Sequence, residues 1–380
     1  MKNFECLEDF ASALEAEMSS DACSALERDE AAFNDWALAL FALQFRHNPW
    51  YRNYCARVGA RPETVTNWVE IPPAPALAFR EPGLTCLTPE RVSRVFLSSG
   101  TTASVPSRHA HHEGSLRLYR RSALTWFHRC LFGGDGAKEG RGFSERPTMV
   151  LLTPDEDAAP QSSLVFMLEA VRREWGAADS FCAGRIGKQG LWELDERALL
   201  PKLEEFCVRR QPVLLLGTAF NYVQLLDQLS ARGMALPLAE GSWAMETGGY
   251  KGRTRSLPRA ELCAHLRDWL GLPSDRIFSE YGMCELSSQA YGRQGRAGEA
   301  SAASPQFVFP PWTKVRVLSP ETLEEAADGE PGMIAVWDLA NAWSVMAVLT
   351  GDLGRWQGAG LELLGRASAS VQRGCSLMAG

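Results

Sequence analysis

The chain has 380 residues, of which 46% are apolar and 22% charged, a balance typical of a folded protein with a substantial core. Its formal net charge of −7 argues against broad electrostatic attraction to nucleic acid or to an anionic membrane. The N-terminus, Met1-Lys2-Asn3-Phe4-Glu5, lacks the apolar segment of a signal peptide, and no apolar stretch is long enough to span a membrane. Ten scattered cysteines without a Cys-x-x-Cys pair favour free thiols and a cytoplasmic location.

About the first ninety residues are predicted to be mostly helical. Apolar residues recur at helical spacing from Phe33 to Leu43, and His47-Asn48-Pro49 ends the pattern. The Pro-rich stretch Ile71–Pro75 then predicts an extended connector.

Beyond the connector, short apolar runs alternate with helical patterns. The runs that suit buried strands are residues 95–97, 150–152 and 213–216. The expected helices are 164–175, capped by Ser163 and ended by Gly176, then 222–229 and 260–270. This alternation predicts an α/β fold with a mostly parallel sheet covered on both faces. Near the end, Val315 and Val317 alternate with basic residues, which predicts a half-exposed strand in a smaller β subdomain.

Four short segments have the composition of ligand-binding loops. Ser98-Ser99-Gly100-Thr101-Thr102 follows a predicted strand, and its hydroxyls and backbone N–H groups suit phosphate oxygens. The segment Thr247-Gly248-Gly249-Tyr250-Lys251 allows close backbone approach to a planar ligand, with a lysine for phosphate. Tyr281-Gly282-Met283-Cys284-Glu285 offers an aromatic ring for a base and a carboxylate for Mg²⁺. Thr350-Gly351-Asp352 places an aspartate, at an expected tight turn, where it can accept ribose hydroxyls. Each segment alone is more typical of an ordinary loop.

Two clusters of polar residues favour structural interpretations. His109, His111 and His112 lie close together without the spacing of a zinc site, so we expect a polar loop or the rim of a strand. Arg117, Arg120 and Arg121 are typical of a solvated helix face, with a role in phosphate or partner binding as the alternative.

In this order and rough spacing, the four segments resemble the adenylate-forming superfamily, which includes acyl-CoA synthetases and the adenylation domains of peptide synthetases. Gly365-Arg366 then follows where that superfamily has its hinge. A narrower resemblance, to the acyl-protein synthetase of bacterial luminescence fatty-acid reductase, runs from about residue 45 to the C-terminus. The segments that carry it are Leu152-Thr153-Pro154, Ser162-Ser163-Leu164, Leu216-Gly217-Thr218-Ala219-Phe220, Glu246–Lys251 and Arg373-Gly374-Cys375-Ser376-Leu377.

The resemblance implies an enzyme that uses ATP and Mg²⁺ to convert a carboxylic acid, a fatty acid by preference, into acyl-AMP. Its fold would be the large N-terminal domain of adenylate-forming enzymes, layered α/β subdomains plus a small β subdomain. By position, Ser99, Gly100, Thr101 and Thr102 would hold the ATP phosphates, and Glu285 with Thr102 would bind Mg²⁺. Gly248 and Gly249 would line the adenine and acyl pocket. Tyr281 would lie against adenine, and Asp352 and Arg366 would hold the ribose.

The resemblance also implies an acyl-protein intermediate. Cys375 would accept the acyl group as a thioester, for delivery to a second protein such as a reductase. The implied layout is a large domain over residues 1–365 and a short tail over 366–380.

The chain departs from the superfamily pattern in two places. After Thr101-Thr102 the usual Gly and Pro-Lys are replaced by Ala103–Arg108, so Arg108 or Lys251 is left to supply the phosphate cation. The sequence ends fourteen residues after Arg366, so we expect no mobile C-terminal domain with its catalytic lysine. That expectation argues against ordinary CoA ligation. A CoA ligase that uses a partner chain, and a nucleotide-binding scaffold without activity, stay as alternatives. The particular acid, the acceptor protein and the oligomeric state are not encoded in these motifs.

Overall fold

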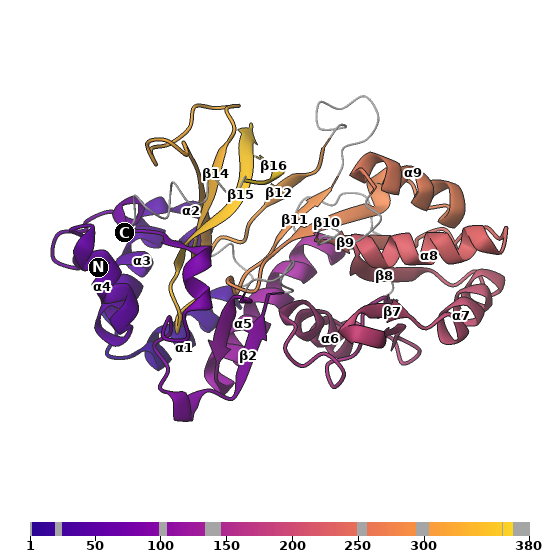
Figure 1. The fold of residues 1–380 in the computed structure, drawn as a ribbon, viewed down its shortest axis with the longest axis horizontal. Helices are drawn as coiled ribbons and strands as arrows, with labels where there is room; N and C mark the ends of the chain where they lie inside the picture. Colours follow the sequence, from indigo (N-terminus) through magenta and orange to yellow (C-terminus); the bar gives the residue numbers. More distant parts are fainter. Residues whose placement is uncertain are drawn as a thin grey trace. The chain divides into compact units, whose positions relative to one another are not determined.

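A computed structural model describes residues 2–19, 25–98, 105–133, 146–248, 257–293, 304–358 and 360–367, and the chain forms two compact units (Figure 1). The first unit comprises Met1–Trp126, Met283–Ala290 and Val308–Gly380. The second comprises Phe127–Gly282 and Tyr291–Phe307. The chain therefore passes from one unit to the other within the motif that contains Tyr281 and Glu285.

The first unit begins with the predicted helical segment. Its helices are α1 (Leu7–Met18), α2 (Ala25–Arg28), α3 (Glu30–His47), α4 (Pro49–Arg57) and α5 (Glu113–Phe127). Asn48 ends α3 and caps α4, since its side chain accepts a hydrogen bond from the N–H of Tyr51. The expected end of the helical pattern at Asn48-Pro49 is therefore confirmed, although a second helix follows at once.

Strands that belong to two sheets, one two-stranded and one large, complete the first unit. One is the antiparallel pair β2 (Arg94–Leu97) and β3 (Arg108–His111). The other contributes, in this order, β13 (Thr313–Leu318), β14 (Gly332–Asp338), β15 (Ala347–Gln357) and β16 (Gly360–Arg366), all antiparallel. The Pro-rich connector adds β1 (Ala74–Pro75), parallel to β15. The predicted strand through Val315 and Val317 is confirmed as β13.

The second unit holds the parallel sheet. Its strands are β4 (Thr148–Leu151), β5 (Phe181–Cys182), β8 (Val213–Thr218), β9 (Trp243–Thr247), β10 (Ile277–Tyr281), β11 (Ala290–Arg293) and β12 (Gln306–Val308), in the spatial order β12-β11-β10-β9-β8-β4-β5. From β5 through β4, β8 and β9 to β10, each strand is parallel to the next. A separate hairpin consists of β6 (Gly184–Ile186) and β7 (Trp192–Leu194).

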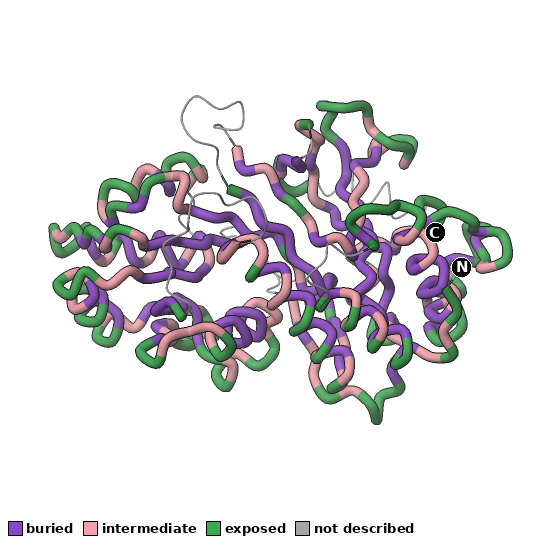
Figure 2. The backbone as a smooth tube through the Cα atoms, turned by 180° about the vertical axis from the view of Figure 1, so that it is seen from behind, coloured by how far each residue is buried: buried purple, intermediate pink, exposed green. Residues whose placement is uncertain are grey.

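The strands of this sheet are covered on both faces. Every residue of β4, β9 and β10 is buried, and successive side chains of a strand point to opposite faces. Figure 2 shows the tube through this sheet almost entirely in the buried colour. Helices α7 (Glu196–Val208), α8 (Ala219–Ala231) and α9 (Arg259–Leu270) share one apolar cluster with β4, β8, β9 and β10. The predicted parallel α/β sheet is thus confirmed.

Three local predictions are corrected. Residues 95–97 form β2, which belongs to the antiparallel pair instead of the parallel sheet. Ser162, not Ser163, caps α6 (Ser163–Trp175), because the Ser162 side chain accepts from the N–H of Val165. Thr350–Asp352 lie inside strand β15, where Gly351 adopts a φ of 77° beside a register shift, and not at a tight turn. Among the described helices, none has the length and apolar content that crossing a bilayer requires.

Candidate active site

The segment Ser98–Thr102, predicted to suit phosphate oxygens, begins directly after β2 and precedes β3 in the sequence. Ser98 pairs with Ser107, since its N–H donates to the carbonyl of Ser107 at 3.0 Å and its Oγ accepts from the N–H of Ser107 at 2.9 Å. The predicted strand before this segment is therefore confirmed as β2. Ser99, Gly100, Thr101 and Thr102 lie outside the described residues.

Gly248 and Tyr281 lie at one edge of the second unit's sheet. Strands β9 and β10 are parallel, with Thr247 beside Glu280, so the residues that follow both strands emerge at the same edge. Ligands of open parallel sheets bind at the carboxyl ends of strands. Gly248 has a φ of 67°, a backbone conformation that favours glycine. Tyr281 is buried, and its ring centroid lies 6.2 Å from that of Phe307. Gly249 and Lys251 lie outside the described residues.

Two buried carboxylates at this edge were missed by the sequence interpretation. Glu280 accepts a hydrogen bond from the hydroxyl of Thr247. Glu246 accepts from Ser279 Oγ at 2.5 Å and pairs with Nε of Arg259 at 3.2 Å. Burial raises the pKa of Glu246, and the charge of Arg259 and the Ser279 hydrogen bond oppose that rise. The sequence signal that could have identified them is an acidic residue near the end of each of two apolar strands.

Glu285 lies in a buried turn of the first unit. The N–H of Leu286 donates to the carbonyl of Met283 at 3.1 Å, which closes the turn around Cys284 and Glu285. Glu285 is 5% exposed. Among the described residues, its side chain accepts a hydrogen bond from the thiol of Cys284, with 3.3 Å between the sulfur and Oε2. A buried carboxylate is costly unless a cation balances it. The position of Glu285 therefore suits a divalent cation, which commonly takes one or two protein carboxylates together with phosphate oxygens.

Buried side chains from two other parts of the first unit hold the segment that contains Glu285. His109 bonds to the carbonyl of Cys284 at 2.8 Å, and the Nδ2 of Asn341 donates to the carbonyl of Glu285 at 2.8 Å. Asp338 accepts from the N–H of Ser287 at 2.9 Å. Because this segment is neither strand nor helix, these side chains provide the partners that its backbone would otherwise lack.

Two of the three histidines, His109 and His111, are buried strand residues instead of part of a polar loop or rim, whereas His112 follows β3 and is half-buried. His109 and His111 both lie on β3, with ring centroids 4.1 Å apart, and are 3% and 1% exposed. Because a carbonyl oxygen only accepts, His109 must carry its proton on Nδ1. Burial lowers the pKa of His109 to about 4, although the Cys284 carbonyl favours the charged form. Burial also lowers the pKa of His111, and a positive charge on His109 would lower it further.

This burial predicts a loss of stability in acid. Below pH 6.5 the unfolded chain protonates His109, whereas the folded chain does so only near pH 4, so stability falls through this range. An asparagine at position 109 can keep an N–H donor for Cys284 without titrating. Between pH 6.5 and about pH 5, His109→Asn should therefore lose about 2 kcal/mol less unfolding free energy than the wild type. Urea unfolding at the two pH values measures this difference. Parallel losses in the two proteins would contradict it.

Asp352 and Arg366, to which the resemblance gives a shared role, lie next to each other. They are cross-strand partners on β15 and β16, and Nε of Arg366 lies 3.0 Å from Oδ1 of Asp352. The Asp352 side chain is 14% exposed and that of Arg366 is 72% exposed. Gly365 has a φ of 111°, which strongly favours glycine at the point where the strand delivers Arg366. The pair presents a carboxylate and a guanidinium side by side, the donor and acceptor set that a ribose could use.

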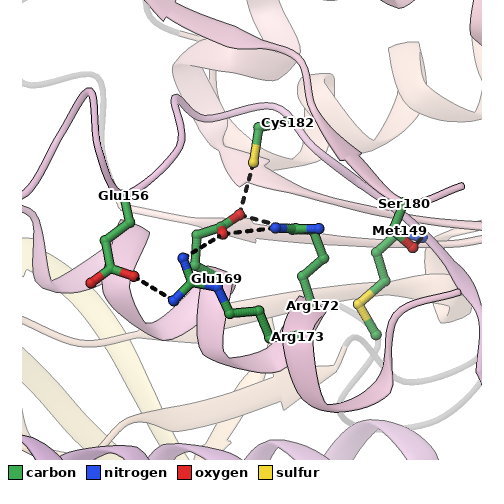
Figure 3. Close-up of polar contacts among 7 residues, drawn as sticks. All are labelled: Met149, Glu156, Glu169, Arg172, Arg173, Ser180 and Cys182. Atoms are coloured by element: carbon green, nitrogen blue, oxygen red, sulfur yellow. Dashed lines mark hydrogen bonds and ion pairs between the residues drawn. The ribbon is translucent and has the colours of Figure 1, made fainter. Parts of the chain in front are cut away.

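The eight described cysteines are all free thiols, and several are unsuited to nucleophilic chemistry. Burial raises the pKa of Cys55 and of Cys86 to about 12. Figure 3 shows a third case, in which Cys182 donates to the buried Glu169 at 2.9 Å while Arg172 binds the same carboxylate through two nitrogens. Burial and the hydrogen bond to Glu169 both raise the pKa of the Cys182 thiol. Since the thiolate is the nucleophile, these thiols are inert at neutral pH. Cys375 lies outside the described residues.

Comparison with known sequences gives a consistent match. A family model described as Acyl-protein synthetase, LuxE matches residues 16–379. Two curated proteins with the name long-chain-fatty-acid–luciferin-component ligase are similar to the chain. That of Aliivibrio fischeri is 23% identical over 350 residues, which cover 89% of this chain and 85% of the relative. That of Vibrio harveyi is 22% identical over 347 residues, which cover 89% and 84%.

Comparison with solved structures gives the fold. A 2-hydroxyisobutyryl-CoA ligase in the postadenylation state, in complex with 2-HIB-AMP, matches with a TM-score of 0.63 at 14% identity, over 92% of this chain and 71% of that chain. An open conformation of the ligase in complex with 2-HIB-AMP and CoA matches with a TM-score of 0.61 at 14% identity, over 92% and 78%. The two units therefore have the fold of the corresponding part of an adenylate-forming ligase.

Proposed function

Because the chain belongs to the LuxE acyl-protein synthetase family, we propose that it activates a long-chain fatty acid with ATP and transfers the acyl group to a protein thiol. The chain is a ligase of the acid–thiol, AMP-forming kind. The family match over residues 16–379 carries this proposal. The names of the two curated relatives support a long-chain fatty acid as the substrate and a protein component as the acyl acceptor.

The reaction has two steps. In the first, a carboxylate oxygen of the acid attacks the α-phosphorus of ATP, the bond to the bridging oxygen breaks, and pyrophosphate leaves with that electron pair. In the second, a thiolate attacks the acyl carbon and AMP leaves. A carboxylate resists nucleophiles because it is anionic and has no adequate leaving group, and AMP supplies one. The protein must mainly align two anions and stabilise the developing charge.

The proposed roles of the residues follow their positions. Glu285 holds Mg²⁺ together with Thr102. This role is supported by the burial of the Glu285 carboxylate, which pairs with no cationic side chain among the described residues. When bound, Mg²⁺ would neutralise phosphate charge. Asp352 and Arg366 hold the ribose, which their cross-strand pairing supports. Gly248 and Gly249 line the adenine and acyl pocket, and Tyr281 lies against the adenine ring. Ser99, Gly100, Thr101 and Thr102 hold the phosphates.

Cys375 is proposed as the thiol that receives the acyl group, within a tail over residues 366–380 that follows the large domain. The inert thiols at Cys55, Cys86 and Cys182 support a different cysteine for this role. The acyl group then passes to an acceptor protein, for which a reductase is the natural candidate. The eight free thiols favour a reducing compartment, so we place the protein in the cytoplasm.

A CoA ligase is the second candidate, because the two solved structures compared above are of a CoA ligase. The two functions differ in their products. With labelled fatty acid, ATP and Mg²⁺, we expect label on the protein in a form that hydroxylamine releases, whether or not CoA is present. Efficient formation of acyl-CoA by the purified protein, without protein-bound label, would contradict the proposed function and favour the second candidate.

A further inference from the structure

The loop after β14 forms hydrogen bonds with the turn that contains Glu285. Asn341 contacts this turn through both ends of its amide: Nδ2 donates to the carbonyl of Glu285 at 2.8 Å, and Oδ1 accepts from the hydroxyl of Ser287 at 2.6 Å. The same Nδ2 also donates to the carbonyl of Val345, 3.1 Å away in the loop itself. Asn341 is 1% exposed. It therefore holds both the backbone of Glu285 itself and the side chain two residues after it.

Asp338, three residues before Asn341, forms hydrogen bonds with the same segment at Ser287 and Ser288. Its carboxylate accepts from the N–H of Ser287 at 2.9 Å and from the hydroxyl of Ser288 at 2.7 Å. It also accepts from the N–H of Ala340 at 3.0 Å, which fixes the carboxylate within its own loop. Asp338 is 0% exposed. Charge-assisted hydrogen bonds of this kind are among the stronger ones in proteins, so they restrain this part of the segment.

The loop is itself anchored on α3. The side-chain amide of Gln44 donates to the carbonyls of Asn341 and Ala342 at 2.8 and 3.1 Å, and its Oε1 accepts from the N–H of Met346 at 3.0 Å. The Glu285 turn is thus connected through Asn341 to a loop that a buried helix holds in place. Every residue in this chain of contacts belongs to the first unit.

We propose that Asn341 and Asp338 are positioning residues, which hold the Glu285 carboxylate in the orientation that the adenylation reaction requires. This inference rests on the proposed role of Glu285 in binding Mg²⁺. Glutamate is flexible, and its reach is set by the backbone from which it starts. A turn without strand or helix partners would let that backbone move, and a displacement of about 1 Å at a reacting group can cost a hundredfold in rate. The two side chains supply the rigidity that regular structure supplies elsewhere.

The chain offers a closely matched control for Asn341. Gln44 and Asn341 are both fully buried, and each amide donates to two carbonyls and accepts one hydrogen bond. Of these two side chains, that of Asn341 bonds to the Glu285 turn directly, whereas Gln44 reaches the turn only through the backbone carbonyl of Asn341, so the loss of Gln44 should have the smaller effect on Glu285. Asn341→Ala and Gln44→Ala should therefore lower the melting temperature by similar amounts, because each leaves similar groups unpaired. A purely structural role for Asn341 predicts the same functional change in both variants.

The test is the Mg²⁺ dependence of fatty-acid-dependent ATP–pyrophosphate exchange. We expect Asn341→Ala to raise the Mg²⁺ concentration at half-maximal rate about tenfold, the effect of one lost hydrogen bond to a positioned group, and Gln44→Ala to change it less than about twofold. A readout that needs no turnover is the rise in melting temperature that Mg²⁺ with ATP gives over ATP alone. This increment should shrink in Asn341→Ala and persist in Gln44→Ala.

Ser287→Ala provides a milder variant if Asn341→Ala does not fold, since it removes only the hydroxyl that bonds to Oδ1 of Asn341. It should shift the Mg²⁺ midpoint in the same direction, by about threefold. An unchanged midpoint in both variants, or equal shifts in Asn341→Ala and Gln44→Ala, would overturn the positioning role. Glu285→Gln distinguishes the proposed role of Glu285 from the positioning role of Asn341. If Glu285→Gln leaves the Mg²⁺ dependence unchanged, the proposed role of Glu285 is wrong. If Glu285→Gln shifts the Mg²⁺ midpoint and the Asn341 and Ser287 variants do not, only the positioning role is wrong.

Discussion

Cys375→Ser is expected to abolish the protein-bound acyl group while leaving adenylation intact. A serine hydroxyl is a far weaker nucleophile than a thiolate at neutral pH, so the acyl group of acyl-AMP would have no thiol to receive it. A free thiol has a pKa of about 8.5, which leaves a few per cent as thiolate near pH 7, and a neighbouring cation such as Arg373 would increase that fraction. Labelled fatty acid with ATP, followed by digestion and mass spectrometry, locates the hydroxylamine-sensitive label.

Cys284 supplies the comparison, because it is the cysteine inside the Tyr281–Glu285 motif. Its thiol is 7% exposed and donates to Oε2 of Glu285, so it is poorly placed to attack an acyl group. Cys284→Ser should therefore retain the label. Label that persists in Cys375→Ser, or that maps to Cys284, would show that the acyl group resides on a different thiol.

Glu285→Gln is expected to lower the rate of ATP–pyrophosphate exchange by roughly tenfold to a hundredfold. The substitution keeps the shape of the side chain and removes its charge, and a lost charged interaction of about 1.5–3 kcal/mol corresponds to that range. Because the carboxylate is proposed to hold Mg²⁺, the variant should also need more Mg²⁺ for half-maximal rate. Exchange rates at several Mg²⁺ concentrations measure both effects.

Asp352→Asn serves as the control for this prediction. Asp352 pairs with Arg366 and is proposed to bind the ribose, so its loss should also slow exchange and raise the ATP concentration required. It should leave the Mg²⁺ dependence unchanged. If both variants exchange pyrophosphate at the wild-type rate, the assignment of these two motifs to the active site is wrong.

The parallel sheet was predictable because its strands are local signals. The runs at 150–152 and 213–216 are continuous and apolar, as expected for strands buried on both faces, and both lie in the sheet. The run at 95–97 is also apolar, but it pairs with β3 outside the parallel sheet. This pairing was not predicted, because β3 lies in a histidine-rich segment that does not have the composition of a strand. Composition identifies a strand, whereas the identity of its neighbour depends on distant sequence.

The candidate site divides in the same way. Glu285, Asp352 and Arg366 could be proposed from sequence because each belongs to a short motif, and the structure pairs Asp352 with Arg366 on two adjacent strands. The residues that hold the Glu285 turn could not, since His109, Asp338 and Asn341 lie about 50 to 180 residues away from it in sequence. Only the fold brings them together. A polar residue at the end of the buried strand β14, Asp338, was the one local sign of this role.

The most direct test of the proposed function is ATP–pyrophosphate exchange across a panel of carboxylic acids. The purified protein, with ATP, Mg²⁺ and labelled pyrophosphate, is supplied with saturated fatty acids of graded chain length and with short-chain, hydroxy and aromatic acids. We predict exchange that depends on the acid, requires Mg²⁺ and is greatest with long-chain fatty acids. Exchange that never exceeds the acid-free background with any acid in the panel would contradict the assignment of this chain as an acid-activating ligase.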